Sequence, residues 1–216
     1  MQRPLFFMLF AALFSANAAS AEIELSFYGG LQGALPSDVT IADDDAIADT
    51  RFEIDWEGRS FEAPPYYGIR VTRWQSQSFG YGVDFTHNKV YPEGDVLPDG
   101  FRRLEFTDGL NTLTANAYYR WQDALGEVTP YVGGGVGLSV PHVEVFAEDS
   151  RTLGYQITGP AATLIAGASM PINDQWSLFG EYKGTYTVNE ADLDTGGTVS
   201  SDIFTNAVNV GVSFNF

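Results

Sequence analysis

The sequence contains no cysteine, which excludes disulfide bonds, thiolate nucleophiles and thiolate metal sites. Basic residues are scarce: 11 Lys and Arg stand against 28 Asp and Glu, a formal net charge of −17. A chain this acidic does not follow a phosphate backbone, so we expect no nucleic-acid partner. Histidine is also scarce, and any histidine-dependent site must use His87, His142 or both. The 216 residues suffice for one domain of ordinary size.

A long apolar run is missing as well. The one candidate, residues 6–14, has about half of the roughly 20 residues that a membrane-spanning helix needs. Arg3 precedes this run, and the small residues Ala19, Ser20 and Ala21 follow it, as at the cleavage site of a secretory signal peptide. We therefore predict a signal peptide over 1–21, in preference to a transmembrane anchor, and a mature domain over 22–216.

The mature sequence is dominated by apolar residues that alternate with polar ones, the pattern of half-buried β-strands. No window shows a sustained helical period. Abundant glycine (23) and aromatic residues (16 Phe, 11 Tyr, 4 Trp) also suit an all-β protein. The register is ambiguous only near Leu164 and Ile165. Eight strands are predicted, within residues 23–31, 67–72, 79–86, 112–121, 132–140, 155–170, 176–186 and 208–216.

The connections between these segments alternate between short and long. Short polar turns are expected at 75–78, 122–127 and 172–175, and long loops at 34–60, 92–106, 141–154 and 188–201. Three short turns and four long loops are what an up-and-down barrel requires when both termini lie at the same end. Long loops in a compact domain usually carry function.

Alternation alone does not decide between a soluble barrel, apolar inside, and a membrane barrel, apolar outside. Aromatic residues gather at the strand ends beside the short turns, as in an interfacial girdle; they are Phe79, Tyr81, Tyr119, Trp121, Trp176, Phe214 and Phe216. The segment 209–216 is similar to the C-terminal assembly signal of bacterial outer-membrane proteins. We therefore predict an all-β, eight-stranded antiparallel up-and-down transmembrane β-barrel in the outer membrane. We expect a monomer, inserted by the barrel assembly machinery, with both termini in the periplasm.

In such a barrel five charged residues face the lumen: Arg70, Asp84, Arg120, Glu181 and Lys183. Eight strands enclose a space that side chains fill. Charges buried there must pair. The sequence thus predicts an ionic network in the lumen and argues against a channel for small solutes.

Two other patterns are weak signals of chemistry. The glycine-rich segment 133–137 lacks the lysine and the strand–loop–helix context of a phosphate-binding loop, so close strand packing explains it better. Asp43, Asp44, Asp45 and Asp49 crowd the first long loop, but their spacing fails the calcium-loop template. A solvated acidic loop is expected there, with loose binding of divalent ions near lipid phosphates as the alternative.

The two histidines fall at the same, extracellular end of neighbouring predicted strands. His87 ends the third strand, His142 follows the fifth, and the strand between them carries Arg102, Arg103, Glu105 and Asp108 at that end. Two histidines and a carboxylate are the composition of an open non-haem iron-type site. The alternative is that both are rim residues at the level of the lipid head groups, solvated or paired. His87 shares the lipid-facing side of its strand with Phe85. Pro141 is expected to disrupt the register before His142, so the two imidazoles need not face the same side.

Several strings of the mature chain resemble the lipid A oxidase family of small outer-membrane barrels. They lie at 24–30, 56–61, 64–68, 85–91, 103–111, 141–145 and 180–186 and cover most of the mature domain. The resemblance implies an outer-leaflet enzyme that binds lipid A, within lipopolysaccharide. Such an enzyme oxidises the proximal glucosamine to a 2-aminogluconate unit with molecular oxygen as co-substrate and hydrogen peroxide as by-product.

Because oxygen reacts slowly with closed-shell sugars, and no flavin or nicotinamide fingerprint is present, a divalent metal is the expected cofactor. We predict His87 and His142 as metal ligands, with Glu144 or, alternatively, Glu105 or Asp108 as the third ligand, and Glu105, Asp108 or Glu144 as catalytic carboxylates. Lys89, Arg102 and Arg103 are predicted to bind phosphate or carboxylate groups of the lipid. If the histidines are dispensable, the next candidates are Trp56, Glu57 and Arg59 beside the acidic loop. A non-enzymatic barrel with a structural, adhesive or binding role is the competing hypothesis.

Overall fold

The computed structural model describes residues 22–122, 124–147 and 150–216, and only the backbone of Phe106, Thr107 and Asp108. The predicted signal peptide, residues 1–21, lies outside the described residues. Within these ranges no helix is long and apolar enough to cross a membrane.

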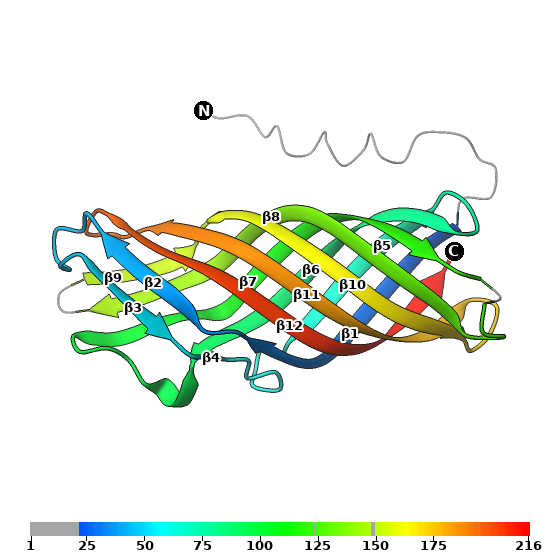
Figure 1. Ribbon diagram of the computed structural model, residues 1–216, viewed down its shortest axis with the longest axis horizontal. Coiled ribbons are helices and arrows are strands. Elements are labelled where there is room, and N and C mark those ends of the chain that lie inside the picture. Colours follow the sequence, from blue (N-terminus) through cyan, green and yellow to red (C-terminus); the bar gives the residue numbers. More distant parts are fainter. Residues whose placement is uncertain (1–21, 123, 148–149) are drawn as a thin grey trace.

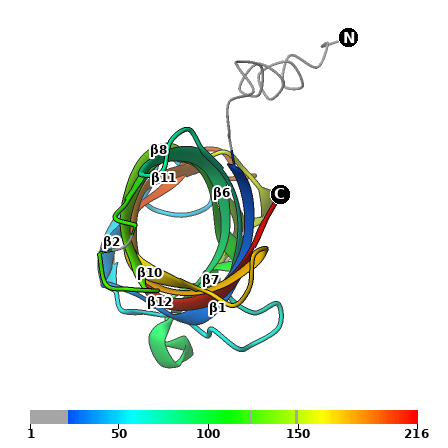
Figure 2. The same cartoon turned by 90° about the vertical axis from the view of Figure 1, so that its right-hand side faces the viewer.

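Eight antiparallel strands form a closed ring (Figures 1 and 2). Each strand pairs with its neighbours in the ring, and β1 closes it by pairing with β12, for example Phe27 with Val212. The predicted up-and-down barrel is therefore confirmed. The ring strands are, in order, β1 (Glu22–Ala34), β5 (Tyr67–Trp74), β6 (Phe79–Pro92), β7 (Phe101–Arg120), β8 (Thr129–Ala147), β10 (Gly159–Pro171), β11 (Trp176–Asp192) and β12 (Thr198–Asn215).

The three short turns lie where predicted, but the four long loops are largely strand. β6 continues to Pro92 and β7 begins at Phe101, so only residues 93–100, with the short helix η1 (Glu93–Asp95), connect them. β8, β11 and β12 likewise extend through the predicted loops. The remaining extension comes from added strands at the left-hand end of Figure 1: β2 (Ser37–Ala42), β3 (Thr50–Ile54) and β9 (Ser150–Tyr155). The short strand β4 (Trp56–Glu57) pairs with the end of β6.

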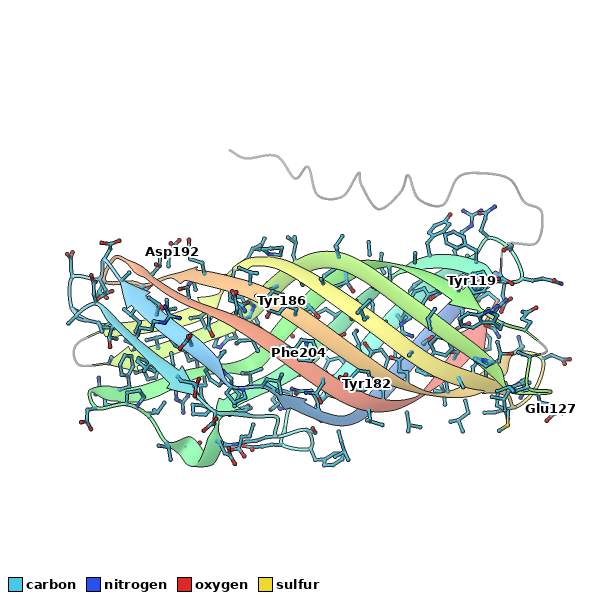
Figure 3. The ribbon with its side chains drawn as sticks, viewed as in Figure 1. Tyr119, Glu127, Tyr182, Tyr186, Asp192 and Phe204 are labelled. Carbon is cyan, nitrogen blue, oxygen red and sulfur yellow. The ribbon has the colours of Figure 1, made fainter. Side chains whose placement is uncertain are left out.

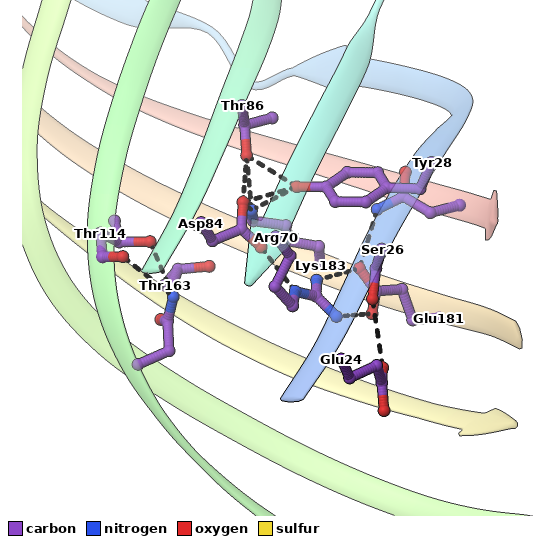
Figure 4. Close-up of polar contacts among 12 residues, drawn as sticks. Glu24, Ser26, Tyr28, Arg70, Asp84, Thr86, Thr114, Thr163, Glu181 and Lys183 are labelled. Atoms are coloured by element: carbon purple, nitrogen blue, oxygen red, sulfur yellow. Dashed lines mark hydrogen bonds and ion pairs between the residues drawn. The ribbon is translucent and has the colours of Figure 1, made fainter. Parts of the chain in front are cut away.

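The lumen holds the predicted ionic network (Figure 4). Arg70 donates to Asp84 over 2.8 Å and to both oxygens of Glu181 over 2.7 and 2.9 Å. Lys183 donates to the second oxygen of Asp84 over 2.8 Å, and Tyr28 donates to the same oxygen over 2.7 Å. All five side chains are buried. Two cations thus balance two carboxylates.

Arg120, the fifth predicted lumen charge, lies closer to the short turns. Its guanidinium donates to Glu22 over 2.9 Å and lies 3.8 Å from the centre of the Trp74 ring.

Above the ionic network the interior becomes apolar. A cluster of buried residues from β2, β3, β6, β7, β8, β11 and β12 fills this part. Val39, Ile41, Val90 and Ile203 are each at most 1% exposed. The extension at the end opposite the short turns therefore has a core like that of a soluble β-protein.

The outer wall is apolar, with exposed side chains such as Leu31, Val136 and Leu164. The edge of this wall beside the short turns is called the lower edge here. At this edge the predicted girdle residues Phe79, Tyr119, Trp121 and Trp176 are 43–45% exposed. An apolar outer wall around a polar lumen is the arrangement of a barrel in lipid. The register question at Leu164 and Ile165 is resolved, because Leu164 is 74% exposed and Ile165 is buried.

Glycines in β8 allow close strand packing, as predicted. A Cβ added at Gly135 or Gly137 would collide with the main-chain oxygens of Ala115 and Leu113 on β7.

Candidate functional site

The predicted functional residues on β6 and β8 lie toward the end of the barrel opposite the short turns. Phe79, Tyr119 and Val132 are aligned across β6, β7 and β8 at the lower girdle, with Tyr119 near the right-hand end of Figure 3. Tyr91 on β6 and Glu144 on β8 each lie 12 residues beyond this row. At about 3.3 Å per residue and a tilt near 40°, both are roughly 30 Å above the girdle. The apolar band of such barrels is about 25 Å tall, so these residues lie at the level of the head groups at the end opposite the short turns.

At this height a cleft of about 520 Å³ opens on the outside of the barrel. We call it the outer cleft. Its floor is formed by β6, β7 and β8, and one side by residues 58–66, the loop that joins β4 to β5. Its charged lining residues are Arg59, Glu62, Asp95, Arg102, Arg103, Glu105 and Glu144.

β4 extends the barrel wall beyond the end of β5, and this places Arg59, two residues after Glu57, in the outer cleft. Glu57 pairs with Tyr91 of β6, and the Arg59 guanidinium lies 4.7 Å from the centre of the Tyr91 ring. Arg59 also donates to Glu57 and Asp95. Hydrogen bonds to Asp95 and Glu57 raise the pKa of Arg59 above its ordinary value, so the group stays cationic.

The second cationic group, Arg103, bridges two carboxylates from neighbouring strands. Glu105 on β7 and Glu144 on β8 are directly opposite each other in the sheet. Arg103 donates to Glu144, and its Nε lies 3.0 Å from Glu105. The two carboxylates are largely buried, whereas the Arg103 side chain is 46% exposed. The arrangement holds two acidic groups beside a cation that faces the cleft.

Besides Arg103, Glu144 has a second neighbour, His142 of β8. Its Nδ1 lies 3.3 Å from Glu144 Oε1, and its ring makes an edge contact with Tyr155 of β9. Burial along β8 keeps its period of two through Pro141, so His142 shares the outward face with Leu138 and Glu144. The disruption of register expected at Pro141 does not occur.

His87 also faces outward, two strands away on β6. It stacks on Tyr67 of β5, with ring centres 5.3 Å apart, and its Nδ1 lies 2.8 Å from Asn111 Oδ1 on β7. β7 separates it from β8 by two interstrand spacings, roughly 10 Å. The two imidazoles therefore share a face, and an ion held by both would have to lie over β7.

The described side chains do not by themselves form a metal centre. Among them no group of three or more His, Asp or Glu residues is placed to hold a metal ion. Glu144 already contacts Arg103 and His142, and the side chain of Asp108 lies outside the described residues. The metal site of His87, His142 and Glu144 stays a prediction.

The predicted substrate-binding residues divide into two groups. Arg102 and Arg103 line the outer cleft. Lys89 is fully buried, and its amine donates to the carbonyl oxygens of Glu62 and Pro64. In this position Lys89 anchors the 58–66 loop instead of reaching a lipid phosphate.

The fallback candidates of the sequence also divide. Trp56 is buried and donates to Ser37 over 2.7 Å, so it belongs to the core. Arg59 joins the same cleft as Glu105 and Glu144, and Glu57 pairs with it. In the acidic loop, Asp44 accepts hydrogen bonds from the amides of Ala46 and Ile47. What the sequence missed is that the 58–66 loop folds back against β6; no local pattern signals this.

Comparisons with known proteins agree with this architecture. Residues 6–216 match the family described as "Outer membrane protein beta-barrel domain". No curated protein matches the chain. Among solved structures, Neisserial surface protein A is similar, with 14% identity over 93% of this chain and 100% of that chain and a TM-score of 0.51. The outer membrane protein OprG from Pseudomonas aeruginosa has 11% identity over 91% of this chain and 96% of that chain, with a TM-score of 0.54. Since the family match covers almost the whole chain and the strands close into the expected barrel, the protein belongs to the outer membrane β-barrel domain family and resides in the outer membrane.

Proposed function

We propose that the protein modifies lipid A at the outer cleft. The observation that supports this best is the position of the cleft, which opens sideways at the level of the outer head groups. A substrate whose acyl chains stay in the membrane reaches such a cleft by lateral diffusion. Its polar lining suits a phosphorylated sugar head group, because guanidinium groups bind phosphate and carboxylate oxygens in pairs.

The reaction is proposed from the family resemblance: oxidation of the proximal glucosamine at its anomeric carbon. The carbon and its hydroxyl together lose two electrons and two protons as a lactone forms, and molecular oxygen takes them up as hydrogen peroxide. Water then opens the lactone to the 2-aminogluconate unit. A redox-active metal held by the predicted ligands His87, His142 and Glu144 would supply the one-electron chemistry that triplet oxygen needs.

The roles of the described residues follow from their places in the cleft. Arg102 and Arg103, with Arg59, bind the anionic groups of the lipid. Glu144 accepts the hydroxyl proton, because it is largely buried, faces the cleft and has His142 beside it to share the charge. Glu105 and Asp108 remain alternative bases.

The test uses purified barrel in detergent with lipid A that lacks the 1-phosphate, since only then is the anomeric hydroxyl free. The parent protein should add one oxygen atom to the lipid, detected by mass spectrometry, and release hydrogen peroxide. Glu144→Gln should lower this rate by about 10²–10⁴-fold. Glu190→Gln, an exposed carboxylate on β11 outside the cleft, is the matched control and should leave the rate unchanged.

Retention of the parent rate by Glu144→Gln would remove Glu144 as the base. Absence of any oxidised product from the parent protein, with each divalent transition metal added in turn, would refute the oxidase.

One observation favours a second function, binding without chemistry. The carboxylates around Arg59 and Arg103 are already paired with these cations, as in a structural or recognition surface. In that case the parent protein should bind lipid A and the Arg103→Ala variant should not. The mass of the lipid A should stay unchanged after incubation with either protein. Cells with and without the gene would then have identical lipid A spectra.

A further inference from the structure

The 58–66 loop has one side in the outer cleft and the other exposed. On the cleft side Arg59 packs over Tyr91. Ala63 and Pro64 are exposed and also line the cleft, whereas Phe61, 79% exposed, and Pro65, also exposed, do not line it. The loop therefore presents an apolar surface that nothing in the described chain covers.

The loop is fixed in place by hydrogen bonds at three of its residues. Ser60 accepts from the amide of Gln32 on β1 over 2.8 Å and receives the amide of Tyr66 on its own carbonyl, also over 2.8 Å. Lys89 on β6 donates to the carbonyls of Glu62 and Pro64. Because these partners belong to the barrel wall, the height of the loop is the height of Gln32 and Lys89.

The two anchors lie in the upper part of the apolar band. Lys89 lies 10 residues beyond the girdle residue Phe79 on β6, which is roughly 25 Å above the girdle. Gln32 lies 7 residues beyond Leu25, whose partner across the sheet is the girdle residue Phe214, and this is about 18 Å. The apolar band is about 25 Å tall, so the loop is anchored between the upper acyl chains and the level where they meet the head groups.

We propose that the 58–66 loop is a membrane-seated element, with Phe61 inserted among the acyl chains of the outer leaflet. An aromatic ring flanked by polar groups is the side chain that this interface favours. The neighbouring Glu62 side chain is 57% exposed and lies 3.9 Å from Arg59. Because this carboxylate stays hydrated, it limits the insertion of Phe61 to a shallow depth. Insertion of Phe61 holds Arg59 at the level of the head groups. This role goes beyond the proposed oxidation, because it requires only a lipid surface and no reaction.

The absence of native cysteine makes a direct test possible. Phe61→Cys and Val96→Cys are each labelled with a nitroxide and reconstituted into phosphatidylcholine vesicles. Val96 is the matched control, since it is also exposed (74%) but lies in the 93–100 connection, beyond the upper end of β6. Heat-modifiability on a detergent gel reports that each variant has folded.

The measurement is the collision rate of the nitroxide with oxygen, which concentrates in lipid, and with a water-soluble nickel chelate. At position 61 the oxygen rate should exceed the nickel rate, and at position 96 the order should reverse. A label at position 61 that collides with nickel as often as the label at position 96 would place the loop in water and overturn the proposal. Neither result depends on whether lipid A is oxidised.

Discussion

Arg70→Ala is the substitution whose effect on stability follows most directly from the structure. Arg70 is 4% exposed and donates to Asp84 and Glu181, whose side chains are fully buried. Its removal leaves Lys183 to balance Asp84, at 2.8 Å, while Glu181 loses its ion pair with Arg70. The lumen network then has one cation and two carboxylates.

The magnitude comes from the cost of breaking a buried ion pair, about 3–5 kcal/mol. Glu181 still accepts hydrogen bonds from Tyr131 over 2.6 Å and Asn209 over 3.2 Å, so the lower part of that range is expected. At 1.4 kcal/mol per tenfold, about 3 kcal/mol changes the unfolding equilibrium roughly a hundredfold.

The assay is urea unfolding in lipid vesicles, followed by the fraction of protein that migrates as the heat-modifiable form. Arg51→Ala is the control: Arg51 pairs with Asp38 on the solvent-exposed face of the β2–β3 hairpin, where ion pairs contribute little. Arg70→Met combined with Glu181→Leu should recover most of the loss, because the unpaired charge is removed as well. The reasoning is refuted if Arg70→Ala unfolds like Arg51→Ala, or if the double variant is less stable than Arg70→Ala.

Three further predictions concern other parts of the barrel. Deletion of Phe216, which contacts the girdle residue Phe214, should reduce membrane insertion far more than Thr205→Ala in the lumen; equal yields in membrane fractions would contradict this. Lys89→Met leaves the carbonyls of the 58–66 loop without their buried donor, at a cost of about 1–3 kcal/mol, and should speed protease cleavage within the loop, whereas unchanged cleavage would remove the anchor role. Burial alone would raise the pKa of Asp44, but hydrogen bonds from Thr195 and from the amides of Ala46 and Ile47 lower it below the ordinary 3.8. The stabilisation by the Asp44 carboxylate is therefore present above that value and is lost as the pH falls through the folded-state pKa. Hydrogen-exchange protection of the Ala46 and Ile47 amides should fall over the same pH range. In Asp44→Asn the protection of these amides should not depend on pH in this range.

The membrane part of the fold was predictable because lipid and lumen impose opposite polarity on alternate residues. Arg70, Asp84, Glu181 and Lys183 were assigned to the lumen by this rule alone, and all are buried there. The girdle followed from the same rule, since Phe79 and Trp176 had to face outward beside the short turns.

The extension opposite the short turns escaped prediction because its strands are covered on both faces. Along β6 every residue from Thr86 to Pro92 is buried, so polar and apolar residues no longer alternate by exposure. Val143, Glu144 and Val145 of β8 are likewise all buried. A strand buried on both sides has no period of two, so the predicted third strand stopped at residue 86 and residues 143–145 were assigned to a long loop.

The outer cleft illustrates the limit for the candidate site. From spacing alone, the rim carboxylates Glu105 and Glu144 and the cation Arg59 were alternative sites, since more than forty residues separate Arg59 from either carboxylate. The 58–66 loop joins them, because Lys89 and Ser60 fix it against the wall that carries both carboxylates. These anchors are one buried amine and one hydroxyl, whose partners are main-chain groups of distant residues, and such contacts leave no periodic signal in a sequence. Loss of activity on substituting Arg59 would therefore not argue against Glu144, because the two groups belong to one site.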